Sequence, residues 1–259
     1  MGKLNGANGN AIWAKLSGST GTYHTDLAAD STGAVVLGGR FSSTTNFGGA
    51  NLTADGTYDG HVVKFDGAGN FVWQAAISGS GGGDDEVYAI TVAPDDKVTA
   101  LAYVRSATVL AAGVSMGPGA TDSSDVVVAQ YTKNGGGVWA KRFGGNGNQS
   151  AYAVSAFPNG DVVTGGVFDT TFSIGTYSVA FSSTMGGYDS FFAVLAGDSG
   201  TPRWAARAGS ADMDYARAVV ASNNVFYGFG QYTQQGTFFG KTLEAVSSTD
   251  VYGVAIARP

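Results

Sequence analysis

The chain of 259 residues contains no cysteine, only five prolines and only two histidines. The absence of cysteine excludes disulfide bonds, thiolate nucleophiles and cysteine metal sites, but it leaves the cellular compartment open. Charged side chains are scarce as well, at 13% of the residues. The net charge of −6 and the scattering of the 14 basic residues argue against binding to nucleic acid or to an anionic membrane, because phosphate binding requires clustered Lys and Arg.

Long apolar runs and helical patterns are also missing. No stretch approaches the length of a membrane-spanning helix, and residues 1–6 lack the apolar core of a signal peptide. No long segment places apolar residues at the three-and-four spacing of an exposed helix. We therefore expect no membrane insertion and few helices. The location stays open between the cytoplasm and secretion after removal of a signal peptide.

Glycine and β-forming residues are abundant instead. The 41 glycines, together with many Ser, Thr, Val and aromatic residues, favour short strands joined by tight turns. Hydrophobic residues make up 44% of the chain, which is enough to form a substantial core. The composition therefore predicts a folded all-β protein.

The tryptophans reveal an internal repeat, because they recur at spacings of 60, 66 and 65 residues. They are Trp13, Trp73, Trp139 and Trp204. Between them, three further strand-like segments recur in a fixed order, as at residues 151–156, 161–168 and 190–195. Four strands per repeat is the arrangement of a β-propeller blade.

We therefore predict an all-β protein, a β-propeller of four four-stranded blades within a single domain, residues 1–259. The blades are expected at about 23–78, 85–143, 149–208 and 214–257. The last blade lacks a fourth strand, and we expect the N-terminal strand at 11–17 to complete it and close the ring. Such closure would remove the exposed sheet edges that an open array leaves.

Three phrases carry a resemblance to a known family. They are Phe47-Gly48-Gly49-Ala50-Asn51-Leu52-Thr53, Val138-Trp139-Ala140-Lys141-Arg142-Phe143-Gly144-Gly145 and Gly186-Gly187-Tyr188-Asp189-Ser190-Phe191-Phe192-Ala193. Over nearly the whole chain, the sequence resembles the bacterial family of seven-bladed β-propeller repeats. The resemblance implies a propeller of secreted or surface-attached bacterial proteins with no shared activity. Because only four copies are present, a closed four-bladed ring, half of a two-chain ring and a piece of a larger protein all remain open.

Four aspartates are equivalent by repeat, since each stands just before the third strand of its blade. They are Asp59, Asp125, Asp189 and Asp250. Loops of a propeller open on one face, where such a ring of carboxylates could bind a hard cation such as Ca²⁺ or accept hydrogen bonds from sugar hydroxyls. The alternative, which we favour, is that each Asp accepts backbone N–H bonds at its own turn.

Two further acidic groups lie in loops of one type and are weaker candidates for a calcium site. They are Asp84, Asp85 and Glu86 in the first group, and Asp212 and Asp214 in the second. Neither group follows the alternating acidic loop with a central glycine and a distal glutamate, so solvated loop carboxylates are the more common explanation.

Aromatic and imidazole side chains supply the remaining candidates. The loop-side tyrosines that could stack on sugars are Tyr23, Tyr58, Tyr188 and Tyr232. His24 is a candidate ligand or acid–base residue, whereas His61 alternates with valines in a strand and is expected to be structural. The segment Gly113–Gly117 matches the pattern of a hydrolase nucleophile elbow but lies in a loop that no helix follows, so we do not assign Ser115 a catalytic role.

The leading prediction is a non-catalytic recognition or scaffolding propeller, monomeric or homodimeric, that binds a glycan, a peptide or a protein through its loop face. One alternative is a hydrolase or lyase that acts on a polysaccharide with carboxylates at the pore mouth. Another is a structural or surface-assembly module, for which an exposed apolar patch or a stable oligomer would be the sign.

Overall fold

The computed structural model describes residues 1–117, 119, 123–181 and 187–259, and in this part of the chain it contains strands and turns but no helix. The predicted all-β class is confirmed. Since there are no helices among these residues, none could cross a membrane. Gly186, which belongs to one of the family-like phrases, lies outside the described residues.

The described strands form four successive antiparallel repeats, numbered here in chain order. Repeat 1 consists of β3 (Thr22–Ala29), β4 (Val35–Phe41), β7 (Asp59–Phe65) and β8 (Phe71–Ser80). Repeat 2 consists of β9 (Asp85–Val92), β10 (Val98–Val104), β13 (Asp125–Tyr131) and β14 (Gly137–Phe143). Repeat 3 consists of β15 (Gln149–Ala156), β16 (Val162–Phe168), β19 (Asp189–Leu195) and β20 (Pro202–Ser210). Repeat 4 consists of β21 (Asp214–Ala221), β22 (Val225–Tyr232) and β25 (Asp250–Ala257).

Short hairpins lie between the second and third strands of the repeats. They are β5 (Thr44–Thr45) with β6 (Leu52–Thr53), β11 (Thr108–Ala111) with β12 (Val114–Met116), β17 (Phe172–Ile174) with β18 (Tyr177–Val179), and β23 (Gly236–Phe238) with β24 (Lys241–Leu243). Two of them link consecutive repeats, because β11 pairs with the end of β8 and β23 pairs with the end of β20. Another hairpin, of β1 (Gly2–Leu4) and β2 (Ala11–Ala14), precedes repeat 1.

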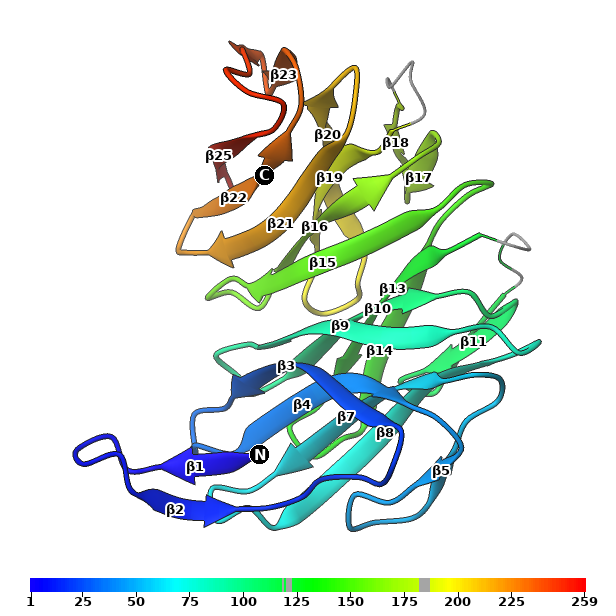
Figure 1. Cartoon of the computed structure of the whole chain (residues 1–259), viewed down its shortest axis with the longest axis vertical. Helices are drawn as coiled ribbons and strands as arrows, with labels where there is room; N and C mark the ends of the chain where they lie inside the picture. Colours follow the sequence, from blue (N-terminus) through cyan, green and yellow to red (C-terminus); the bar gives the residue numbers. More distant parts are fainter. Residues whose placement is uncertain (118, 120–122, 182–186) are drawn as a thin grey trace.

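The repeats stack along the long axis of the molecule, from the N-terminal hairpin at one end to repeat 4 at the other (Figure 1). Their first strands pack in sequence, β3 on β9, β9 on β15 and β15 on β21. A separate hydrophobic core fills each junction, the first between repeats 1 and 2, the second between repeats 2 and 3, and the third between repeats 3 and 4. Gly38 shows how closely the repeats approach, since a Cβ there would lie 2.6 Å from the Val87 side chain.

The expected closure of the ring by residues 11–17 is wrong for this structure. Strand β2 pairs with β1, and β25 pairs only with β22 among the described residues. The cause lies in Trp13, whose indole N–H donates to the carbonyl oxygen of Gly67 in repeat 1 at 3.0 Å. Trp73 and Trp139 make the same bond to the following repeat, to Lys133 at 3.0 Å and to Gly197 at 3.1 Å. The N-terminal hairpin thus lies on repeat 1 where the fourth strand of a preceding repeat would lie.

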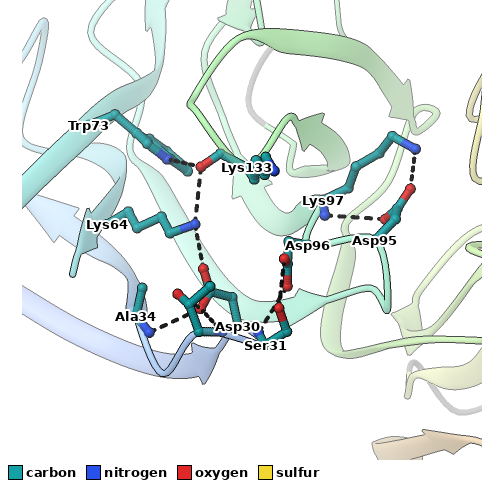
Figure 2. Close-up of polar contacts among 10 residues, drawn as sticks. Asp30, Ser31, Ala34, Lys64, Trp73, Asp95, Asp96, Lys97 and Lys133 are labelled. Carbon is teal, nitrogen blue, oxygen red and sulfur yellow. Dashed lines mark hydrogen bonds and ion pairs between the residues drawn. The ribbon is translucent and has the colours of Figure 1, made fainter. Parts of the chain in front are cut away.

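A buried ion pair within repeat 1 lies beside the junction with repeat 2 (Figure 2). The Lys64 ammonium lies 2.7 Å from Asp30 Oδ2, and both side chains are almost fully buried. The same ammonium donates to the Lys133 carbonyl oxygen at 3.1 Å, beside the bond from Trp73. Burial alone would raise the pKa of Asp30, but hydrogen bonds from Lys64 and Thr32 hold it at about 2.

Candidate functional site

The junctions between repeats share one polar motif at the end where the third strands begin. In the first junction, the backbone N–H of Asp85 donates to the carbonyl oxygen of Tyr58 at 3.0 Å. This bond places Asp85, the first residue of β9, beside Asp59, the first residue of β7. The equivalent bonds join Gln149 to Ser124 at 2.8 Å and Asp214 to Tyr188 at 2.6 Å. The motif therefore pairs Asp59 with Asp85, Asp125 with Gln149, and Asp189 with Asp214.

Asp59, Asp125 and Asp189 lie at three separate junctions, whereas Asp250 begins β25 on the open side of repeat 4. No three His, Asp or Glu side chains of the described ranges come close enough to hold a single metal ion. Backbone N–H groups donate to the aspartates, as from Asp55 to Asp59 at 3.0 Å and from Val246 to Asp250 at 2.5 Å. These bonds are the turn contacts that the structural alternative predicts for these two residues.

Arginines accompany the aspartates in two of the junctions. Arg142 Nε lies 2.6 Å from Asp125 Oδ2, and an Arg207 guanidinium nitrogen lies 3.5 Å from Asp189 Oδ2. Both arginines lie on the fourth strand of their repeat, where Arg142 pairs with Val127 and Arg207 pairs with Phe191. Val127 and Phe191 each come two residues after the aspartate. At the matching position of repeat 1, opposite His61, the chain has Ala76. The fourth strand of repeat 1 therefore brings no arginine to Asp59 and Asp85, and the positive charge that acts on Asp85 is that of Arg142 in repeat 2, which lowers its pKa.

Burial dominates the electrostatics of this first pair. Asp59 and Asp85 are both fully buried. Burial raises the pKa of Asp59 to about 7, and the neighbouring Asp85 carboxylate adds to that shift. Burial also raises the pKa of Asp85, although the backbone N–H groups of Arg105 and Ser106 donate to its Oδ1 at 3.0 and 3.2 Å. A cavity of about 300 Å³ adjoins Asp59 and is lined mainly by Thr53, Asp55, Ser78, Ser80 and Thr108.

The two acidic groups predicted as calcium loops are each split by their strands. Glu86 forms an ion pair with Arg40 at 3.0 Å, whereas Asp85 faces the junction, because neighbouring strand residues point to opposite faces. In the second group, Asp214 accepts bonds from Ser210, whereas Asp212 accepts a bond from Gln234 at 3.1 Å. Neither run of acids therefore gathers around one point.

The candidate tyrosines fall into two kinds of environment. Tyr23 and Tyr58 flank the Arg40 guanidinium, which lies 5.1 and 4.5 Å from their ring centroids. Tyr188 lies beside Tyr215 with 6.3 Å between the ring centroids. Tyr232 is buried against Phe238, and its hydroxyl donates to the Glu244 carbonyl oxygen at 3.1 Å. The ring of Tyr232 is therefore a core element and is not available to a sugar in this structure.

Both histidines of the chain meet in one contact that the sequence did not suggest. His24 Nδ1 lies 3.0 Å from His61 Nε2, and the His61 ring packs 4.7 Å from Phe47 between centroids. In the strand register, Gly39 pairs with His24 on one side and with His61 on the other. Because Gly39 has no side chain, the two imidazoles can meet across it. Burial lowers the pKa of His61 to about 3, with a further contribution from His24.

We expect this buried imidazole to make the protein less stable in mild acid. Below the unfolded pKa of about 6.5, the unfolded chain binds a proton that folded His61 does not, so stability falls with pH until the folded pKa near 3 is reached. Between pH 6.5 and 5, the wild type should lose roughly 2 kcal/mol more than His61→Phe. Urea unfolding of both proteins at each pH measures the difference. Parallel pH profiles, or an NMR titration of His61 near pH 6.5, would contradict this expectation.

The serine of the elbow-like segment lies in a hairpin. Ser115 belongs to β12 (Val114–Met116), which pairs with β11, and its Cα partner is Leu110. A nucleophile elbow instead places its serine on a sharp turn between a strand and a helix. The expectation that this match carries no catalytic role agrees with the hairpin.

No known family and no curated protein matches the sequence. Among solved structures, a protein of unknown function from Bacteroides caccae is similar at 12% sequence identity and a TM-score of 0.36, over 87% of this chain and 76% of that one. The resemblance to seven-bladed β-propeller repeats therefore stays a prediction.

Proposed function

We propose that this chain is a non-catalytic scaffolding module, built of propeller-type blades, that binds a second copy of itself through the open face of repeat 4. The observation that carries the proposal is an exposed apolar face where the other repeats are covered. Tyr227, Phe229 and Val251 are 41%, 49% and 79% exposed, and Phe229 and Val251 line a hollow of about 780 Å³. Contiguous apolar patches of this kind mark interaction surfaces.

The internal junctions indicate what should cover this face. By strand register, Tyr227 and Val251 correspond to Val163 and Ser190 of repeat 3. Those two residues are fully buried, and Val163 belongs to the core that repeat 3 shares with repeat 4. In repeat 3 this face is covered by the first strand of repeat 4. In repeat 4 the equivalent face is exposed.

The opposite end of the molecule offers a matching first strand. Leu27 of β3 is 63% exposed, whereas its equivalents Ile90 and Val219 are buried in the junctions. Ile12 of the N-terminal hairpin is also exposed. If repeat 4 of one copy packs on repeat 1 of another, the free edges of β25 and β2 can pair. The resulting sheet would have the four strands of the other repeats. Two copies joined at both ends would form a two-chain ring.

The oligomeric state tests this proposal. We expect light scattering after gel filtration to give a mass near twice 26.2 kDa at micromolar concentration. Phe229→Asp should weaken the association at least about tenfold, because a buried charge at the centre of an interface is costly. Val246→Asp is the matched control, since Val246 is 96% exposed in a loop and does not line the hollow.

Two results would overturn the proposal. One is a monomer across the whole concentration range. The other is a dimer that Phe229→Asp leaves intact. If a monomer also gives a short distance between spin labels at residues 12 and 251, the chain closes on itself instead. The lack of native cysteine makes such site-specific labelling direct.

A further inference from the structure

The junction between repeats 1 and 2 contains oxygen atoms that have no partners. Asp59 Oδ1, Asp85 Oδ2 and the Ser106 hydroxyl are buried, and none makes a hydrogen bond of normal geometry. All three residues are fully buried. Buried polar atoms are almost always satisfied in folded proteins, so a cluster of orphaned oxygens requires an explanation.

These oxygens belong to one small region. The backbone N–H of Ser106 donates to Asp85 Oδ1 at 3.2 Å, and the Ser106 hydroxyl lies beside the same carboxylate. Gly79 links Ser106 to Asp59, because its backbone N–H bonds the Asp59 carboxylate and a Cβ on it would lie 2.5 Å from Ser106 Oγ. The Tyr58 carbonyl oxygen, bonded to Asp85 N, holds the two strands together at this point.

The junction between repeats 1 and 2 differs from the other two junctions in its charged side chains. Two fully buried carboxylates cannot both remain ionised without a compensating positive charge. Arg142 and Arg207 lie against the aspartates of the later junctions, but Ala76 occupies the corresponding position here. In the second junction, Gln149 also replaces the second carboxylate. The first and third junctions each hold two fully buried carboxylates, but the fourth strand of the first carries no arginine. Arg142 of repeat 2 acts on Asp85 from a distance, while its ion pair is with Asp125.

We propose that Asp59 and Asp85 bind a hard divalent cation of the Ca²⁺ type, with Ser106 as a neutral oxygen ligand. Carboxylate and hydroxyl oxygens are the donors that Ca²⁺ prefers, and it accepts water for the rest of its coordination sphere. The cavity next to Asp59, which Thr53, Ser78 and Thr108 also line, offers room for that water on the Asp59 side of the site. The site joins two residues from different repeats and uses only one member of the acidic run at 84–86.

Binding of Ca²⁺ to the full chain tests the proposal. After treatment with EDTA and dialysis, calorimetric titration at pH 7.5 should give one site, and a hundredfold excess over Kd should raise Tm by roughly 5 °C. Asp59→Asn and Asp85→Asn should each weaken binding at least about tenfold. Asp212→Asn is the matched control and should bind like the wild type, because Asp212 lies outside this junction.

A further variant tests the proposal even if the asparagine variants do not fold. Ala76→Arg supplies the arginine that the later junctions have, so it should fold and should compete with the ion, abolishing the Ca²⁺-dependent rise in Tm. The proposal is overturned if the wild type binds neither Ca²⁺ nor Mg²⁺ in the titration, in which case a shared proton neutralises the pair. It is equally overturned if Ala76→Arg or Asp59→Asn folds and binds Ca²⁺ as tightly as the wild type.

Discussion

Replacing Lys64 by methionine is expected to lower the free energy of unfolding by about 3–5 kcal/mol. Methionine keeps much of the volume of the lysine stem but leaves the buried Asp30 carboxylate without its cation. It also removes the bond to the Lys133 carbonyl oxygen, which ties repeat 1 to repeat 2. Urea unfolding at pH 7 measures the loss.

The control for this variant is Lys97→Met. Figure 2 shows Lys97 in the same view as Lys64. Lys97 pairs with Asp95 on the surface, where both side chains are exposed, so its loss should cost less than about 1 kcal/mol. Because the folded pKa of Asp30 is lowered, the ion pair stabilises the protein above pH 4 and loses its effect as the pH falls through 2. Equal losses for the two lysine variants at pH 7 would contradict the assignment.

Replacing Trp139 by alanine should destabilise the protein by about 3–5 kcal/mol. Its indole is buried in the core between repeats 2 and 3 and donates to the Gly197 carbonyl oxygen of repeat 3. The substitution removes a large apolar surface and leaves a cavity. It also leaves the Gly197 carbonyl oxygen without its donor, so several destabilising effects add in one junction. Thermal and urea unfolding give the change directly.

Trp204→Ala provides the comparison at the same repeat position. Trp204 is only partly buried, and its indole N–H makes no hydrogen bond within the described part of the chain. Its loss should cost at least about 1 kcal/mol less than the loss of Trp139. If the two alanine variants prove equally unstable, the inter-repeat hydrogen bond is not what distinguishes these positions.

The strand content could be predicted because it depends on local signals. Tryptophans and tight turns recur at nearly constant spacing, and the strands predicted at 151–156, 161–168 and 190–195 fall almost entirely within β15, β16 and β19. The closure of the ring could not be predicted in this way, since it depends on which of two surfaces receives β2. The structure shows which surface it is. Trp13 bonds repeat 1 in the way that Trp73 and Trp139 each bond the repeat that follows them.

The junction site was visible only in part. The position of Asp59 before a strand is a local feature, whereas its pairing with Asp85 depends on the contact between two repeats. One usable signal was present three residues after each tryptophan, where the chain has Leu16, Ala76, Arg142 and Arg207. The predicted glycan or peptide ligand of the loop face, the hydrolase alternative and a bacterial surface location stay predictions.

The three separate cores have a consequence for how this protein can change in length. Each core is shared by two neighbouring repeats, so stability is close to a sum of nearest-neighbour terms. A duplication or deletion of one whole repeat, in register with its tryptophan, would leave every remaining junction of the same kind. Such an event would alter how many units the array contains without redesigning its interior, and this makes copy number an evolutionarily accessible variable for the protein.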